Sequence, residues 1–146
     1  QGSSVNKSKL LAVSVLFALS ACSTVNQSVV TESLDLVGNK EAVEKYWVVE
    51  RKVAPEYPLE AGKNGISGCV EFTLLIDGNG KPQNLTVIKS FPGSTFNKKA
   101  YEALRKWQWT PGSDNTQKQP VLTTIQLDFT TQKSVNQSDA YSACKI

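Results

Sequence analysis

Residues 69–76 alternate between apolar and other side chains, and this alternation constrains the fold more than any other feature. One face of the predicted strand would carry Val70, Phe72, Leu74 and Ile76. The next four residues, Asp-Gly-Asn-Gly, tolerate positive φ and predict a turn. A returning strand over 84–90 would place Leu85 and Val87 on the same core face. The pattern predicts an antiparallel hairpin whose apolar face other elements must cover.

A helical stripe follows the hairpin and supplies that cover. The apolar side chains at helical spacing are Phe96, Ala100, Ala103, Leu104 and Trp107. Ser94 or Thr95 is the predicted N-cap. We expect Trp107 and the nearby Trp109 to pack in the core rather than to contact a ligand.

The last strand is predicted over Val121–Phe129, with its odd-numbered residues on the core face. A β-prone segment at 47–53 leads into the domain, and residues 41–46 and 59–63 could each form a short helix. This order predicts an α+β fold, a small antiparallel three-stranded sheet with one main helix packed on one face.

The N-terminal segment has the layout of an export signal. Lys7 and Lys9 precede the apolar run 10–21, which is too short to span a bilayer as a helix. Leu-Ser-Ala before Cys22 looks like the lipobox of bacterial lipoproteins, which predicts lipidation at Cys22. An ordinary signal peptide with an incidental cysteine is the alternative. Residues 1–4 resemble the remnant of a cleaved tag.

These features divide the chain into four predicted parts. Residues 1–21 would be tag remnant and lipoprotein signal peptide, and 22–46 a lipidated tether. Residues 47–130 would form the domain, and 131–146 a polar tail without a clear period.

Histidine is absent from the sequence, which excludes Ser-His-Asp and Cys-His nucleophiles and histidine-ligated zinc. Besides Cys22, the chain has Cys69 and Cys144, which could form a disulfide in an oxidising compartment or remain as two inert thiols. Asp77 and Glu71 have no evident acid–base partner. Lys89 and Ser90 point to opposite faces of a strand and make no dyad. We therefore expect no enzyme, no cofactor and no metal site.

The net charge argues against nucleic acid as a partner. The whole chain carries +3, and Lys7 and Lys9 account for two of these charges, so residues 22–146 carry 3 − 2 = +1. A nearly neutral domain lacks the electrostatic basis for binding phosphate backbones.

Residues 53–130 resemble the C-terminal periplasmic domain of the TonB family. The shared residues, in order, are Pro55, Tyr57, Pro58, Ala61, Gly65, Ile66, Gly68, Val70, Phe72, Asp77, Gly78, Val87, Ser90, Pro92, Phe96, Ala100, Ala103, Leu104, Arg105, Trp107, Trp109, Pro111, Gly112, Pro120 and Val121. Each match is weak alone, but the matches keep the order and spacing of the family.

The resemblance implies a binding module that takes an extended peptide, the TonB box of an outer-membrane transporter, as an added strand. The matching strand here, and thus the expected peptide-binding residues, are Val121, Leu122, Thr123, Thr124, Ile125, Gln126, Leu127 and Asp128. The side chains at 122, 124, 126 and 128 would face away from the helix. Alternatively, the tail covers this edge.

The sequence also departs from the TonB pattern. It shows no full-length membrane span, no histidine and no proline-rich run. A lipid anchor inserts into one leaflet, so we expect no direct coupling to the proton-motive force. Ser23 after Cys22 favours the outer membrane, with the domain facing the periplasm. The alternative function is a structural envelope lipoprotein that self-associates, for example as a homodimer.

Overall fold

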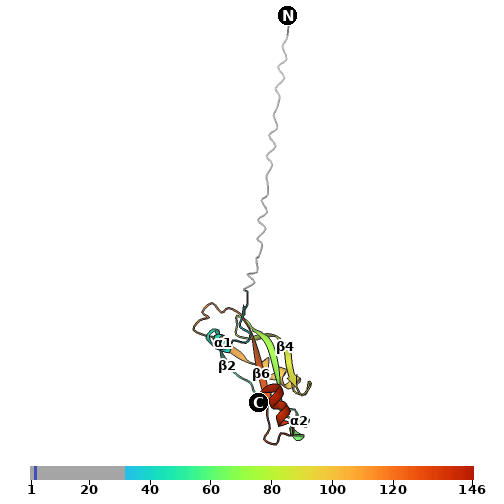
Figure 1. Cartoon of the computed structure of the whole chain (residues 1–146). Coiled ribbons are helices and arrows are strands. Elements are labelled where there is room, and N and C mark those ends of the chain that lie inside the picture. The colour runs from blue at the N-terminus through green and yellow to red at the C-terminus, as the bar shows by residue number, and fades with distance from the viewer. Residues whose placement is uncertain (1, 3–31) are drawn as a thin grey trace.

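The computed structural model describes residues 2 and 32–146. In chain order the elements are β1 (Leu34–Asp35), α1 (Lys40–Tyr46), β2 (Trp47–Arg51), α2 (Leu59–Lys63), β3 (Gly68–Ile76), β4 (Pro82–Phe91), α3 (Asn97–Leu104), β5 (Gln108–Pro111), β6 (Val121–Phe129) and α4 (Gln137–Cys144). Figure 1 shows these elements in space. The α+β fold expected from the sequence is confirmed.

The main sheet has the strand order β1-β6-β3-β4. The three long strands are antiparallel, as expected, and β1 adds a short parallel strand beside β6. A second, two-stranded antiparallel sheet joins β2 to β5. The sequence had predicted neither β1 nor this second sheet.

One face of the main sheet packs under α3 to form the core. The four apolar residues of β3 predicted on this face are fully buried, and so is the helical stripe from Phe96 to Trp107. Three aromatic rings close one end of this core: Phe96 stacks on Phe129 with ring centroids 4.3 Å apart, and Tyr57 meets both rings edge-on. Because buried aromatic rings contribute large contact areas, this cluster fixes α3 on the sheet.

Trp107 and Trp109 lie in this core. The indole nitrogen of Trp107 donates a hydrogen bond to the Val53 carbonyl at 2.9 Å. Trp109 is also buried, as expected. Trp47, at the start of β2, is 1 % exposed, so it is a core residue as well.

One detail of the hairpin prediction holds only in part, and one detail of the helix prediction is wrong. Val87 lies opposite the buried Phe72, on the predicted face, but it is 38 % exposed because β4 is the edge strand of the sheet. Two register shifts, each with one extra residue in β4, lie on either side of the segment that holds Leu85 and Val87. Neither Ser94 nor Thr95 caps α3, because Phe96 occupies the N-cap position without a side-chain hydrogen bond.

The segments expected to be tether and tail contain structure. Part of the 22–46 segment forms β1 and α1, and Leu34, Leu36 and Val43 pack against the core. Part of the 131–146 segment forms α4, which lies across the strands in Figure 1. Asn136 fixes this segment because its amide exchanges two hydrogen bonds of 2.9 Å with the backbone of Ser67.

Gly68 shows why the β3–β4 pair needs a glycine where β3 begins. A Cβ atom at this position would lie 1.9 Å from the carbonyl oxygen of Phe91. No side chain fits there, because the backbones of Gly68 and Phe91 approach each other closely.

Candidate functional site

The strand β6 is straight and regular along its whole length. Its register with β3 runs without a shift from Gly68 opposite Phe129 to Ile76 opposite Val121. Because side chains alternate along a strand, the odd-numbered residues of β6 face α3. Of these, Val121, Thr123, Leu127 and Phe129 are buried, and Ile125 is half-buried.

The even-numbered residues of β6 face the other side of the sheet, as the sequence predicted. Leu122, Thr124 and Gln126 are half-buried and Asp128 is exposed. The amide of Gln126 donates hydrogen bonds to the Asp128 carboxylate at 2.7 Å and to the Cys144 carbonyl at 3.0 Å. The end of α4 therefore touches this face of β6 through Gln126.

The first two residues of β6 already have a partner on their outer edge. Val121 pairs with Leu34 and Leu122 with Asp35, both in β1. The backbone N–H groups of Leu34 and Leu36 donate to the carbonyls of Pro120 and Leu122, each at 2.9 Å. The expectation of an open edge is therefore wrong at Val121 and Leu122.

Beyond Leu122, no strand in the part of the chain that the structure describes pairs with the outer edge of β6. The N–H and C=O of one strand residue point to the same side, and this side alternates along the strand. Since the Leu122 carbonyl points to β1, the backbone groups of Thr124, Gln126 and Asp128 also point outward. These three residues form the open edge of β6, and we use that name for it below.

The sequence missed two neighbours of the open edge, β1 and the end of α4. The Leu-Asp-Leu pattern at 34–36 was the one local signal for β1, but it is too short to predict a strand. The contact of Gln126 with Cys144 depends on how the chain folds back, so no local pattern could have indicated it.

Cys69 and Cys144 are joined by a disulfide with an S–S distance of 2.09 Å. Cys69 lies on β3 and Cys144 ends α4, so the bond holds α4 on the face of the sheet opposite α3. Both cysteines are buried. Cys22, the predicted lipidation site, and the predicted signal segment lie outside the described residues.

The side chains considered for acid–base chemistry have structural partners. Glu71 forms an ion pair with Lys89 across β3 and β4 at 3.4 Å. The Asp77 carboxylate accepts hydrogen bonds from the backbone N–H of Asn79 and Lys81 and from the Gln83 amide, at 2.8–3.0 Å. Asp77 therefore stabilises the turn between β3 and β4.

These hydrogen bonds also set the pKa of Asp77. Partial burial alone would raise the pKa of this carboxyl, but the bonds from Lys81, Gln83 and Asn79 together outweigh burial. The pKa of Asp77 therefore lies below its ordinary value, so the group is ionised near neutral pH and is a poor general acid.

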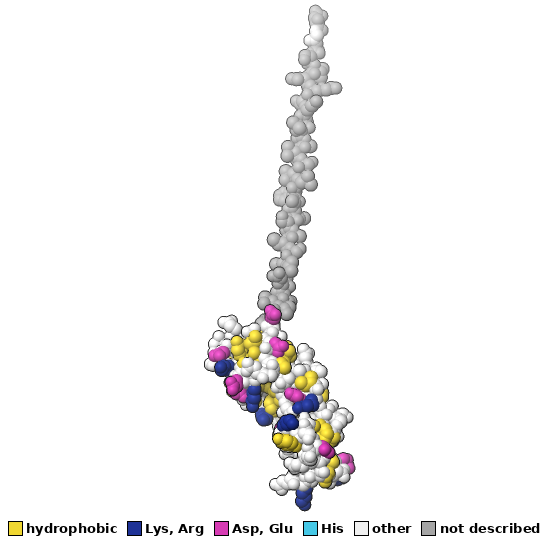
Figure 2. Space-filling view, viewed as in Figure 1, with side chains coloured by type: hydrophobic (Ala, Val, Ile, Leu, Met, Phe, Trp, Pro, Cys, Tyr) yellow, Lys and Arg dark blue, Asp and Glu magenta, His cyan; other side chains and the backbone are white. Residues whose placement is uncertain are grey.

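Three further structural findings bear on the function. Among residues 32–146, no group of three His, Cys, Asp or Glu side chains is placed to hold a metal ion. Over the same residues, every helix is too short or too polar to cross a membrane. On the surface shown in Figure 2, charged side chains of both signs are interspersed with small hydrophobic patches.

Comparison with known families gives one matching model, described as the Gram-negative bacterial TonB protein C-terminal, over residues 53–131. This range is more than half of the chain. It agrees to within a residue with the 53–130 range over which the sequence motifs resemble that family.

Individual relatives match part of the chain. Protein TonB of Yersinia enterocolitica is 33 % identical over 58 residues, which are 40 % of this chain and 23 % of that protein. Protein TonB of Vibrio cholerae is 30 % identical over 47 % of this chain and 28 % of its own length. Protein TonB of Xanthomonas campestris is 31 % identical over 51 % of this chain and 34 % of its own. The chain thus matches about a quarter to a third of each relative.

A solved structure matches the fold. The solution NMR structure of the Pseudomonas aeruginosa TonB CTD superposes with a TM-score of 0.51 and 24 % sequence identity. The match covers 60 % of this chain and 88 % of that structure.

Proposed function

The chain belongs to the family of C-terminal domains of the Gram-negative bacterial TonB protein, and on that basis we propose that it is a binding module of the bacterial envelope rather than an enzyme. In this proposal the module binds an extended protein segment as an added strand, such as a segment carried by an outer-membrane transporter. The observation that carries the proposal is the open edge of β6, where no strand of residues 32–146 pairs with the outward backbone groups of Thr124, Gln126 and Asp128.

The regularity of β6 supports strand addition. An added strand needs evenly spaced donors and acceptors, and the unshifted register with β3 keeps the outward groups of β6 evenly spaced. The short strand β1 already pairs with the beginning of the same edge at Val121 and Leu122. We therefore propose that the incoming segment covers Thr123–Asp128, and not the full 121–128 stretch expected from the sequence.

The side chains beside this edge would contribute to specificity. Thr124 and Gln126 offer hydroxyl and amide groups, and Asp128 is an exposed carboxylate. Main-chain hydrogen bonds give most of the affinity in this mode of recognition, and alternate side chains select the sequence that binds.

The location follows from the N-terminal motif. We propose that the chain is lipidated at Cys22 and faces the periplasm, with Ser23 favouring the outer membrane. A lipid anchor at Cys22 would insert into one leaflet. The proposed role is therefore binding without direct coupling to the proton-motive force.

Proline at Thr124 tests the open edge directly. Proline lacks an N–H, and at this position it would remove an outward donor without removing a hydrogen bond to β3. We expect Thr124→Pro to weaken binding of a TonB-box-like peptide to the full chain by about tenfold, measured by fluorescence anisotropy. Thr124→Ala keeps the N–H, so it should bind within about twofold of the unchanged protein.

Equal affinities of Thr124→Pro and Thr124→Ala would contradict strand addition at this edge. The molecular mass of the protein in solution gives a second check. A stable dimer joined through β6 would instead favour the self-associating envelope lipoprotein.

A further inference from the structure

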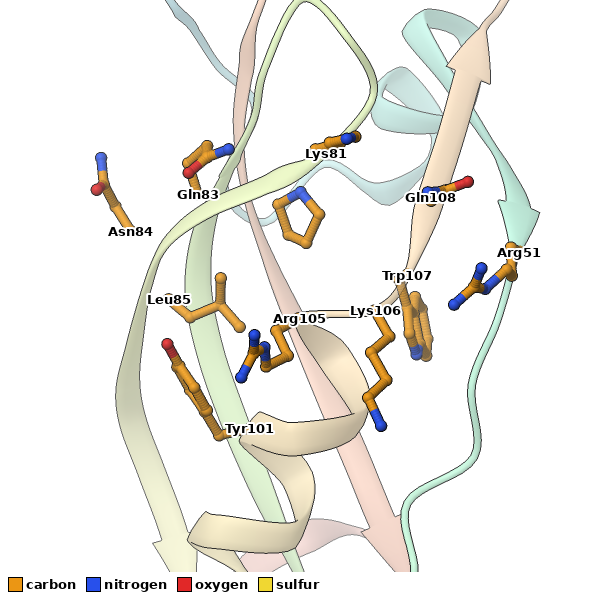
Figure 3. Close-up of a pocket in the computed structure, with 11 residues that line it drawn as sticks. Arg51, Lys81, Gln83, Asn84, Leu85, Tyr101, Arg105, Lys106, Trp107 and Gln108 are labelled. Atoms are coloured by element: carbon orange, nitrogen blue, oxygen red, sulfur yellow. The ribbon is translucent and has the colours of Figure 1, made fainter.

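A basic groove lies beside β4, at the opposite edge of the main sheet from β6 and its open edge. It forms where the beginning of β4, the end of α3 and the end of β2 meet, and its volume is about 690 Å³. We define the basic groove by Arg51, Lys81, Gln83, Tyr101, Arg105 and Lys106, which Figure 3 shows around it.

The charge of the groove has one sign. Four cationic side chains line it, and no aspartate or glutamate does. Residues 32–146 carry nearly equal numbers of positive and negative side chains, with 14 of the 16 Lys and Arg and all 13 Asp and Glu. The groove is therefore a local excess of positive charge on an almost neutral domain.

In residues 32–146, the groove cations form no ion pair within 4 Å. Within the described residues, Lys40, Lys63, Lys89 and Lys99 each lie within 4 Å of a glutamate carboxylate. None of the four groove cations has such a neighbour in residues 32–146. The hydrogen bond from Lys99, with a smaller effect from the charge of Lys106, lowers the pKa of Glu56, so this acid is already bonded outside the groove.

Neutral side chains in the groove suit a polar ligand with some apolar character. The Gln83 side chain, whose amide already donates one hydrogen bond to Asp77, and the ring of Tyr101 both line the groove, and Tyr101 is 46 % exposed. Lys52 adds a fifth cation nearby, with its ammonium group 5.1 Å from the centre of the Trp107 ring. Hydrogen-bond donors and an aromatic surface thus lie between the charges.

The arrangement of the cations favours an extended ligand. In Figure 3, Arg51 and Lys81 project from separate walls and Arg105 from a third, so the cations do not converge on one point. Carboxylates spaced along a chain could each meet one cation.

We propose that the basic groove is a second ligand site that binds an extended acidic segment of a partner protein. Recognition runs through side chains, because the two register shifts in β4 make this edge of the sheet a poor template for an added strand. Arginine at positions 51 and 105 suits two-pronged hydrogen bonding to carboxylates. This site does not depend on strand addition at β6.

The test uses the full chain labelled with ¹⁵N and a short peptide of alternating glutamate and serine. We expect amide shifts at Arg51, Gln83 and Arg105, binding that weakens as salt rises, and no shifts at the open edge of β6. The double variant Arg51→Gln, Arg105→Gln should bind about fivefold more weakly. The variant Lys63→Gln, Lys133→Gln removes the same charge elsewhere on the surface, and its affinity should change less than twofold.

Three outcomes would overturn the proposal. Equal loss of affinity in the two double variants would mean that net charge alone attracts the peptide. Binding of the matched glutamine–serine peptide with equal affinity would exclude recognition of carboxylates. Displacement of the peptide by inorganic phosphate at a similar concentration would identify a site for compact anions. A failure of the proposed strand addition would be seen separately, because a TonB-box-like peptide would then cause no amide shifts at the open edge of β6.

Discussion

The two outer strands of the antiparallel sheet differ in regularity, although both flank β3. The strand β6 pairs with β3 in one unbroken register, whereas β4 carries two extra residues at register shifts. A regular edge presents an evenly spaced row of donors and acceptors, and bulges interrupt such a row. In our two proposals, the open edge of β6 therefore binds the backbone of a partner segment. The basic groove beside β4 binds the charged side chains of an acidic segment.

The largest expected effect comes from releasing α4, which touches β6 through Gln126. Replacing both cysteines by serine opens a loop with a sequence separation of 75 residues. The entropy gained by the unfolded chain should lower the free energy of unfolding by about 4 kcal/mol, measured by chemical denaturation. The single variant Cys144→Ser, which leaves a free Cys69, should lose a similar amount. A loss below about 1 kcal/mol would contradict this stabilising role of the bond.

The next largest effect is expected from a substitution that pushes β4 away from β3 and leaves the open edge of β6 unchanged. Gly68→Ala would place a methyl group against the Phe91 carbonyl, so we expect a loss of about 3 kcal/mol. Gly62→Ala in α2 is the matched control, because its methyl group would meet only the Tyr57 ring, at an ordinary contact distance of 3.5 Å. This control should be neutral or slightly stabilising in thermal unfolding. Equal stability of the two variants would contradict the close approach at Gly68.

A pair of valine substitutions compares the two edges directly. Asn84 in β4 has a φ of +54°, which a β-branched residue adopts only at a cost of about 1–2 kcal/mol. We expect Asn84→Val to destabilise by that amount. Thr124→Val, on the regular edge, should stay within about 0.5 kcal/mol. Similar denaturation midpoints for the two variants would mean that β4 is as regular as β6.

The smallest effect is expected at Asp77, which lies in the turn between β3 and β4. The pKa of this carboxyl is lowered in the folded state, so its contribution is complete above the ordinary pKa and is lost as the pH falls through the folded pKa. We expect Asp77→Asn to cost about 1 kcal/mol at neutral pH and less in acid, measured by denaturation at several pH values. The exposed Glu32→Gln is the control. A pH-independent difference between Asp77→Asn and the unchanged protein would refute the role of the charge.

The long periodic elements could be predicted from the sequence. The alternation in β3 and the stripe through Phe96 and Trp107 reflect burial, and the structure buries both. The same reasoning gave the face of Val87 but not its exposure, because alternation does not show that β4 is an edge strand whose side chains are only partly covered. Ser94 and Thr95 suited a cap by residue type, but α3 begins later, at Asn97.

The surroundings of the candidate site were harder to predict. The segments β1 and α4 are short and polar, and they form through contacts with distant residues such as Leu122 and Cys69. Local patterns carry no such information. The cations of the basic groove come from three separate elements, so their proximity appears only in the folded chain.

The measurement that tests the central claim most directly is the set of intermolecular NOEs between the full chain and a bound TonB-box-like peptide. Strand addition predicts backbone contacts between the peptide and Thr124, Gln126 and Asp128, with β1 still paired to Leu122. Peptide contacts confined to other surfaces, with the amides of the open edge still exchanging freely with solvent, would contradict the account.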